Sequence, residues 1–123
     1  MDIKDVVAAI KRIEHTTYVE PYGGSVAVLL AKDPSRVEVY NDTLSNVVNF
    51  FRALRDRDLE RARLFVDADI EQACKRLRSI QIEHLDPFEV MRRYDSEKTL
   101  HYVSVPSLEL SAFLKTLKGK VIL

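Results

Sequence analysis

The stretch TYVEPYGGSVAVLL, residues 17–30, decides the fold of this chain together with VEVYND, residues 37–42. Tyr18 and Val19 form a short predicted strand that ends at a glycine turn. Residues 26–31 then predict a helix, and residues 37–40 predict a second strand. A strand, a turn, a helix and a second strand that ends in an acid form the order in which a parallel sheet holds a nucleotide-like cofactor. The stretch therefore predicts a cofactor site on an α/β sheet.

Helices and strands alternate over the rest of the chain. Apolar residues from Ile3 to Ile13 recur at helical spacing, and Asp2 is placed to cap that helix. Further helices are predicted at 43–54 with Thr43 as its cap, over 52–78 as one long or two broken helices, at 88–94, and at 107–117 with Ser107 as its cap and Lys118-Gly119 at its end. Further strands are predicted at 79–83, 100–105 and 120–123. About five strands that alternate with helices indicate one α/β domain, residues 1–123, with a mostly parallel, Rossmann-like sheet.

Loops at the carboxyl ends of the strands are where such sheets bind ligands. We therefore expect residues 20–25, 41–43, 84–87 and 104–107 to line one rim. Gly23 and Gly24 lack side chains, so a cofactor can approach the backbone there. Asp42 follows about 20 residues later, where an acid accepts hydrogen bonds from a ribose diol. The alternative is a plain tight turn with Asp42 as the cap of a helix from Thr43, because Val26 stands where a further glycine is expected.

Composition excludes several classes of protein. Nineteen basic and nineteen acidic residues leave no net charge, so the whole chain is not drawn to nucleic acid or to an anionic membrane. The single cysteine, Cys74, excludes an intramolecular disulfide and favours a reducing, cytoplasmic setting. No window reaches the roughly 18 apolar residues of a membrane span. His15, His84 and His101 lack metal-ligand spacing, so we expect no metal site. The arginines of 52–78 alternate with acids and predict a solvated helix face rather than a phosphate site.

Several segments together resemble the adenine-N6 DNA methyltransferases that carry a D-P-P-Y catalytic motif. These segments are YVEPYGGS (18–25), EVYND (38–42), VNFFRALR (48–55), QIEHLD (81–86) and GKVIL (119–123). The resemblance implies a methyltransferase-type Rossmann sheet that binds S-adenosylmethionine. It places Asp42 at the cofactor ribose and Asp86 at the adenine, although Asp86 can equally cap the helix that follows it. It places around the methionine part of the cofactor Glu20, Tyr22, Gly23, Gly24 and Ser25.

The catalytic motif of that family is replaced here. At its place stand Ser104, Val105, Pro106 and Ser107. Without the acid nothing orients a target amine toward the methyl group, and without the aromatic ring a flipped base has no stacking surface. Relative to the family, an amino-terminal P-G-G-K segment, the target-recognition insert near 56–71 and the carboxy-terminal strands are also missing. We therefore expect a truncated relative with no catalytic residues for adenine methylation, and we do not expect DNA binding.

Three functions stay open on this basis. The first is a catalytically inactive, methyltransferase-like protein, a pseudoenzyme, that retains S-adenosylmethionine binding. The second is a scaffold-only interaction or regulatory protein that dimerises, because an edge strand at Val121, Ile122 and Leu123 offers backbone groups to a second copy. The third is an active methyltransferase on another substrate, with residues 104–107 rebuilt for it. Of these, the inactive cofactor-binding protein is the function that we predict.

Overall fold

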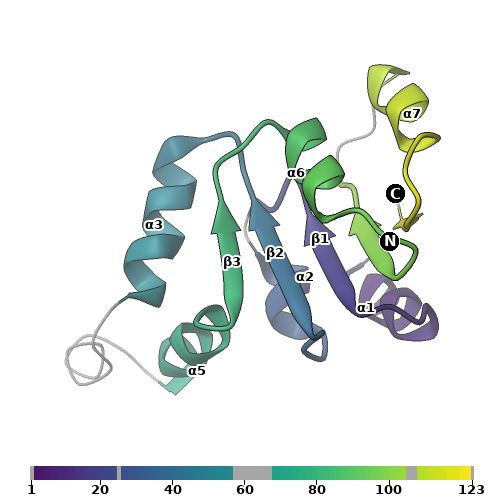
Figure 1. The fold of residues 1–123 in the computed structure, drawn as a ribbon. Coiled ribbons are helices and arrows are strands. Elements are labelled where there is room, and N and C mark those ends of the chain that lie inside the picture. The colour runs from purple at the N-terminus through teal and green to yellow at the C-terminus, as the bar shows by residue number, and fades with distance from the viewer. Residues whose placement is uncertain (1, 25, 57–67, 105–107, 123) are drawn as a thin grey trace.

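The computed structural model describes residues 2–24, 26–56, 68–104 and 108–122. Five strands form one all-parallel sheet in the order β3-β2-β1-β4-β5, with helices on both of its faces (Figure 1). The strands are β1 (Thr17–Glu20), β2 (Val37–Asn41), β3 (Ile80–Glu83), β4 (Thr99–Tyr102) and β5 (Lys120–Ile122). The helices are α1 (Ile3–Arg12), α2 (Ala27–Ala31), α3 (Ser45–Arg55), α5 (Ala68–Leu77), α6 (Pro87–Tyr94) and α7 (Leu108–Leu114). The predicted Rossmann-like α/β fold is confirmed, and its strand order reverses between β1 and β4.

The larger apolar core lies on the sheet face that α1, α2, α3 and α5 cover. Tyr18, Tyr40 and Leu100 point from the strands into this core, where they meet buried helix side chains, namely Val6, Ile10, Leu29, Val48, Phe51 and Leu77. Because successive residues of a strand point to opposite faces, Glu20 and Glu38 share this face with the tyrosines. Two carboxylates are therefore buried in an otherwise apolar layer.

The opposite face is covered by α6 and α7. Val90 of α6 packs against Val19 and Val39 of the two central strands. Further along the sheet, Met91 and Leu110 form another cluster with Val103. Figure 1 shows α6 in front of the strands and α2 behind them. The central strands are therefore covered on both faces, as a parallel sheet requires.

At the starts of two helices, the side chain of an aspartate accepts a hydrogen bond from a backbone amide. The side chain of Asp2 accepts a 2.9 Å hydrogen bond from the amide of Asp5, which confirms the predicted cap of α1. The cap predicted at Thr43 is wrong, because α3 begins at Ser45 after Leu44, which has no side-chain cap. Asp42 supplies the acceptor there, since its Oδ1 lies 2.9 Å from the amide of Leu44.

The last helix is shorter than its apolar pattern predicts. α7 ends at Leu114, so Leu117 lies beyond it, although it still packs on the core. The amides of Lys118 and Gly119 donate to the carboxylate of Asp95 over 2.7 and 2.8 Å. These two residues therefore lead into β5 and do not end the helix. The predicted cap at Ser107 and the end of the strand at residue 123 lie outside the described residues.

The arginines of residues 52–78 are only partly described, because residues 57–67 fall outside the structure. Arg76 forms an ion pair with the buried Glu38, and Arg52 donates a 2.9 Å hydrogen bond to the carbonyl of Ile82. The prediction of a solvated face is therefore wrong for these two residues. Their guanidinium groups instead bind acceptors of the adjacent sheet.

The outer strand β5 pairs with β4 alone among the described strands. Its apolar residues Val121 and Ile122 are half-buried and pack against the two core clusters on either face. The backbone edge that faces away from β4 is the part of this strand left for a further partner. None of the helices in the described residues has the length and apolar composition that a membrane span requires.

Candidate functional site

A cavity of about 190 Å³ lies at the carboxyl edge of the sheet, beside the ends of β1 and β4. This is the position at which the strand order reverses, and parallel α/β sheets bind ligands there. Glu20, Tyr22 and Gly23 line the cavity, and all three are predicted site residues. The remaining lining residues come from α1, α2 and β4, namely Ile3, Ala27, Val28 and Tyr102. The cavity therefore joins the glycine turn to the first residues of two helices.

Glu20 is the acid of this cavity. Its side chain is only 5% exposed, and its Oε1 accepts a 2.6 Å hydrogen bond from the hydroxyl of Tyr18. Burial raises the pKa of Glu20 to about 7, although the Tyr18 hydrogen bond and the charge of Lys32 both act to lower it. A buried carboxyl group that titrates near neutrality and faces a cavity is a candidate functional group.

The glycine turn is held by contacts that only small residues allow. The amide of Gly23 donates a 2.7 Å hydrogen bond to the carbonyl of Asn41. A Cβ at Gly23 would lie 2.1 Å from Cε2 of Tyr40, so the tyrosine ring occupies the space of a side chain. Gly24 has a φ of +54°, and a Cβ there would meet nothing within 4 Å. Gly23 is thus required by the packing of Tyr40, and Gly24 leaves the open face that a ligand could approach.

Val26 has the backbone conformation that favours glycine. Its φ is 65°, in the left-handed region, which is strained for a β-branched residue. The pattern of a glycine-rich cofactor turn predicts a glycine at this position. The backbone of Val26 has the conformation that a glycine adopts most easily. The side chain is buried in the core below α2, which compensates part of the strain. Val26 therefore preserves the shape of the turn without the glycine.

Asp42 lies behind the turn and not in the cavity. Its Oδ2 accepts a 2.9 Å hydrogen bond from the amide of Gly24, and its Oδ1 accepts one from Leu44. Asp42 as a residue is 9% exposed. As a helix cap, Asp42 supports the start of α3. It also lies at the end of β2 beside the glycine turn, where the sequence predicts an acceptor for a ribose. Each oxygen keeps a lone pair for a further donor.

The remaining predicted site residues lie apart from this cavity. Asp86 is exposed and caps α6 through Oδ1, 2.9 Å from the amide of Phe88. This is the capping alternative of the sequence, and it leaves Oδ2 without a helix amide. Ser104 is exposed, and its hydroxyl donates a 3.1 Å hydrogen bond to the carbonyl of Tyr22. Ser25 and residues 105–107 lie outside the described residues.

Asn41 was predicted on the rim without a role of its own, and its side chain ties two loops of the rim to the end of β2. Its amide nitrogen donates 3.0 Å hydrogen bonds to the carbonyls of Pro21 and Leu85. Its amide oxygen accepts a 2.8 Å hydrogen bond from the amide of Leu85. A buried side-chain amide with this set of partners fixes the loops after β1 and β3 to the end of β2. The signal in the sequence was a second polar residue before Asp42 at the strand end.

The histidines form no metal centre in the described part of the chain. No group of three or more histidine, cysteine or acidic residues gathers there in a way that could hold a metal ion. His101 is not at the rim but buried within β4, where its Nε2 lies 3.1 Å from Asp95. His84 is exposed beside the rim, with Nε2 3.1 Å from the carbonyl of Thr43.

No protein-family model and no curated protein matches this sequence. The class that the structure defines is an α/β protein with a Rossmann-like parallel sheet.

Proposed function

We propose that the carboxyl edge of this sheet binds S-adenosylmethionine or a closely related compound without methylating adenine. The observation that carries the proposal is the cavity that Glu20, Tyr22 and Gly23 line together at the reversal of the strand order. These residues belong to the segment whose resemblance to adenine-N6 DNA methyltransferases suggests this cofactor. The protein is, on this proposal, a methyltransferase-like pseudoenzyme.

The cavity is large enough for only part of the cofactor. About 190 Å³ is less than the roughly 300–1,000 Å³ of pockets that enclose a drug-sized ligand. The methionine end would occupy the cavity, with its ammonium group beside Glu20. The nucleoside would lie along the open face of Gly24, toward Asp42 and Asp86. By the resemblance, Asp42 would contact the ribose and Asp86 would contact the adenine.

Proton release is a specific consequence of this placement. The pKa of Glu20 is raised to about 7, so the carboxyl group is partly protonated near neutral pH. A ligand ammonium beside it favours the ionised form and displaces the proton. Binding at pH 6 should therefore release a proton to the buffer. Titration calorimetry in two buffers with different ionisation enthalpies measures that release directly.

Two variants test the role of Glu20. Glu20→Gln keeps an acceptor for the Tyr18 hydroxyl but removes the charge, and we expect about 10- to 100-fold weaker binding and no proton release. Glu97→Gln is the matched control, because Glu97 is exposed beside the start of β4, at the amino edge of the sheet. Wild-type protein that gives no binding heat with S-adenosylmethionine or S-adenosylhomocysteine at millimolar concentration would refute the proposal.

Ser104 is the reason that we expect no methyl transfer to adenine. This residue occupies the position of the family's catalytic acid, and its hydroxyl is engaged with the Tyr22 carbonyl. A hydroxyl group cannot supply the charge that an acid gives to the target amine. Transfer of labelled methyl groups from the cofactor to DNA would contradict this part, whereas transfer to RNA or protein would favour an active enzyme with another substrate.

Dimerisation is the second proposal, and the free edge of β5 supports it. Among the described strands β5 pairs on one side only, and such a strand exposes backbone donors and acceptors that a second copy can bind. We propose a homodimer through β5 that would operate with or without the cofactor. Light scattering combined with size exclusion tests it, and a monomer at high protein concentration would rule it out.

A further inference from the structure

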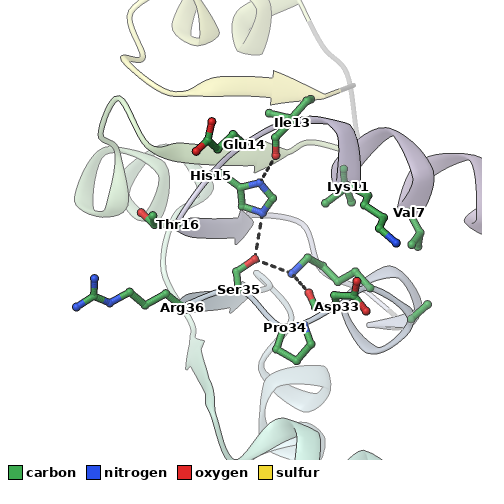
Figure 2. Close-up of a pocket in the computed structure, with 13 residues that line it drawn as sticks. Val7, Lys11, Ile13, Glu14, His15, Thr16, Asp33, Pro34, Ser35 and Arg36 are labelled. Atoms are coloured by element: carbon green, nitrogen blue, oxygen red, sulfur yellow. Dashed lines mark hydrogen bonds between the residues drawn. The ribbon is translucent and has the colours of Figure 1, made fainter.

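A second and larger cavity, of about 490 Å³, lies at the amino edge of the sheet. It opens between the segment that follows α1 and the loop that joins α2 to β2, and Figure 2 shows its lining side chains. Its apolar lining residues are Val7, Ile10, Ile13, Ala31 and Pro34. His15 and Ser35 also line it, and they contribute a base and a hydroxyl group.

His15 lies between a carbonyl group and a hydroxyl group (Figure 2). Its Nδ1 is 2.7 Å from the carbonyl oxygen of Ile13, and its Nε2 is 3.0 Å from Oγ of Ser35. Because a carbonyl oxygen can only accept, Nδ1 carries the proton and donates it. In the neutral ring Nε2 then has the free lone pair, so the Ser35 hydroxyl donates to it. The backbone of Ile13 thus fixes the tautomer that a general base needs.

Lys32 adds a positive charge to the same hydroxyl group. Its Nζ lies 2.9 Å from Oγ of Ser35, and it is held by a 2.6 Å ion pair with Glu38. The side chain of Lys32 is buried, and its contact with the half-buried Ser35 is part-buried at the cavity wall. A cation that donates to Oγ stabilises negative charge on that oxygen. Ser35 therefore donates to a base and accepts from a cation at once.

We propose that Ser35 and His15 form a nucleophile and general-base pair that hydrolyses small carboxylic esters bound in this cavity. The arrangement has the three parts that an activated serine requires: the nucleophile, a base within hydrogen-bond reach and a third group that orients the base. The site is separate from the carboxyl edge, where the cofactor is proposed. Neither proposal depends on the other.

The reaction would proceed through an acyl-serine. Oγ of Ser35 bonds to the ester carbonyl carbon while Nε2 of His15 takes the hydroxyl proton. The bond from that carbon to the alcohol oxygen then breaks, and the leaving alkoxide takes the proton from Nε2. Water next attacks the acyl carbon, His15 takes a proton from it, and that proton returns to Oγ as the acid leaves. The three hydrogens of the Lys32 ammonium go to Oγ of Ser35, the carbonyl of Asp33 and the carboxylate of Glu38. Lys32 would therefore stabilise the oxyanion of each step by its charge and not by a hydrogen bond.

The apolar part of the cavity lining favours an ester with a short apolar acyl group. Val7, Ile10 and Ile13 offer apolar contacts to a short hydrocarbon chain, and the volume falls in the range of small-ligand pockets. The side chain of Arg36 extends away from the His15–Ser35 pair in Figure 2, so it does not fill the space beside Oγ. We therefore expect short esters of apolar acids, such as p-nitrophenyl butyrate, to react.

Covalent labelling of the wild-type chain with a fluorophosphonate probe tests the pair. Peptide mapping should locate the phosphonyl adduct on Ser35, and p-nitrophenyl butyrate should slow its formation by competition. Wild-type protein that gives no adduct, or an adduct only on other serines, would overturn the proposal. This measurement needs no variant and so does not depend on how a variant folds.

Three variants separate catalysis from a structural tie between two loops. Ser35→Ala should abolish the adduct, and His15→Gln should slow labelling about 100-fold, the usual contribution of a general base. Ser45→Ala, at an exposed serine that begins α3 on the opposite edge, should label as the wild type does. Thermal melting confirms that each variant is folded. Folded His15→Gln protein that labels at the wild-type rate would show that the hydrogen bond only ties the loops together.

Discussion

Oδ2 of Asp42 accepts a 2.9 Å hydrogen bond from the backbone amide of Gly24, which lies 18 residues earlier in the chain. Oδ1 of the same carboxylate accepts from the amide of Leu44 at the start of α3. One side chain thus connects the glycine turn after β1 to the helix after β2. The two segments from which the sequence predicts a cofactor site are joined by this acid.

Replacing Asp42 with alanine removes both hydrogen bonds and leaves two backbone donors without them. Hydrogen bonds to a charged acceptor contribute roughly 1.5–3 kcal/mol each, so we expect the free energy of unfolding to fall by about 3 kcal/mol. Asp42→Asn keeps one acceptor oxygen and should lose about half as much. Urea unfolding measures both changes. A loss below about 0.5 kcal/mol for Asp42→Ala would contradict this account.

Gly23→Ala should destabilise the turn because its Cβ would lie 2.1 Å from Cε2 of Tyr40. Overpacking of this kind costs about 2 kcal/mol. Tyr40→Leu in the same chain should relieve the clash, so the double variant should lose less than the sum of the two single losses. Gly119→Ala is the control, because its Cβ would lie 2.5 Å from the carbonyl oxygen of Thr99 and Tyr40→Leu should not relieve that clash. Thermal melting of the three single variants and of the two double variants with Tyr40→Leu checks the cycle, and simple additivity for Gly23 and Tyr40 would reject it.

The burial of Glu20 predicts a pH dependence of stability. Its pKa is about 7 in the folded chain against an ordinary value of 4.5, so the unfolded chain ionises first as the pH rises. The stability that protonated Glu20 contributes is fully present below pH 4.5, falls up to about pH 7 and is constant above it. At roughly 1.4 kcal/mol per pKa unit, the wild type should lose about 3 kcal/mol relative to Glu20→Gln over this range.

Urea unfolding of the wild type and of Glu20→Gln at pH 4, 6 and 8 measures that difference. The glutamine still accepts the Tyr18 hydrogen bond, so other titrating groups cancel in the comparison. A stability difference that stays flat across these pH values would show that Glu20 ionises normally in the folded chain.

Glu38 holds two cations on the face of the sheet that α2 and α5 cover. It is 1% exposed, pairs with Nζ of Lys32 over 2.6 Å and also pairs with Arg76. These partners lower its pKa although burial opposes them. Glu38→Gln would leave both cations without a counter-charge, and we expect a loss of about 3–5 kcal/mol in urea unfolding. Asp56→Asn, which breaks an exposed pair with Arg55, should change nothing measurable, and an equal effect of both variants would refute the distinction.

Local patterns in the sequence predicted the elements because each pattern has a local physical cause. Asp2 and Asp86 cap helices through amides two or three residues away, so their roles are contained in a few neighbouring residues. Thr43 failed as a cap because Asp42 satisfies the amide of Leu44. α7 was predicted too long because Leu117 keeps its core contact from a position beyond the helix. At Thr43 a neighbouring residue took over the local role, whereas at Leu117 a tertiary contact replaced a local preference.

The sequence predicts which residues belong to the candidate site, but it does not predict which of them line the same cavity. Glu20, Tyr22 and Gly23 share one cavity, whereas Asp86 lies on another loop. The role of Asn41 was missed, since its three hydrogen bonds reach loops 20 and 44 residues away in the chain. The pair of His15 and Ser35 was missed for the same reason, because 20 residues separate them.

The sequence by itself determined the order of strands and helices along the chain and the parallel sheet, and it predicts a ligand site at the carboxyl edge. Apolar periodicity and turn residues are local, and right-handed crossovers leave few ways to arrange the strands. Only the tertiary structure decided which polar groups meet and which are desolvated. The neutral-range pKa of Glu20, the ion pairs of Glu38 and the base beside Ser35 arise from burial and from contacts between distant segments. Such contacts depend on distances that no spacing along the chain encodes.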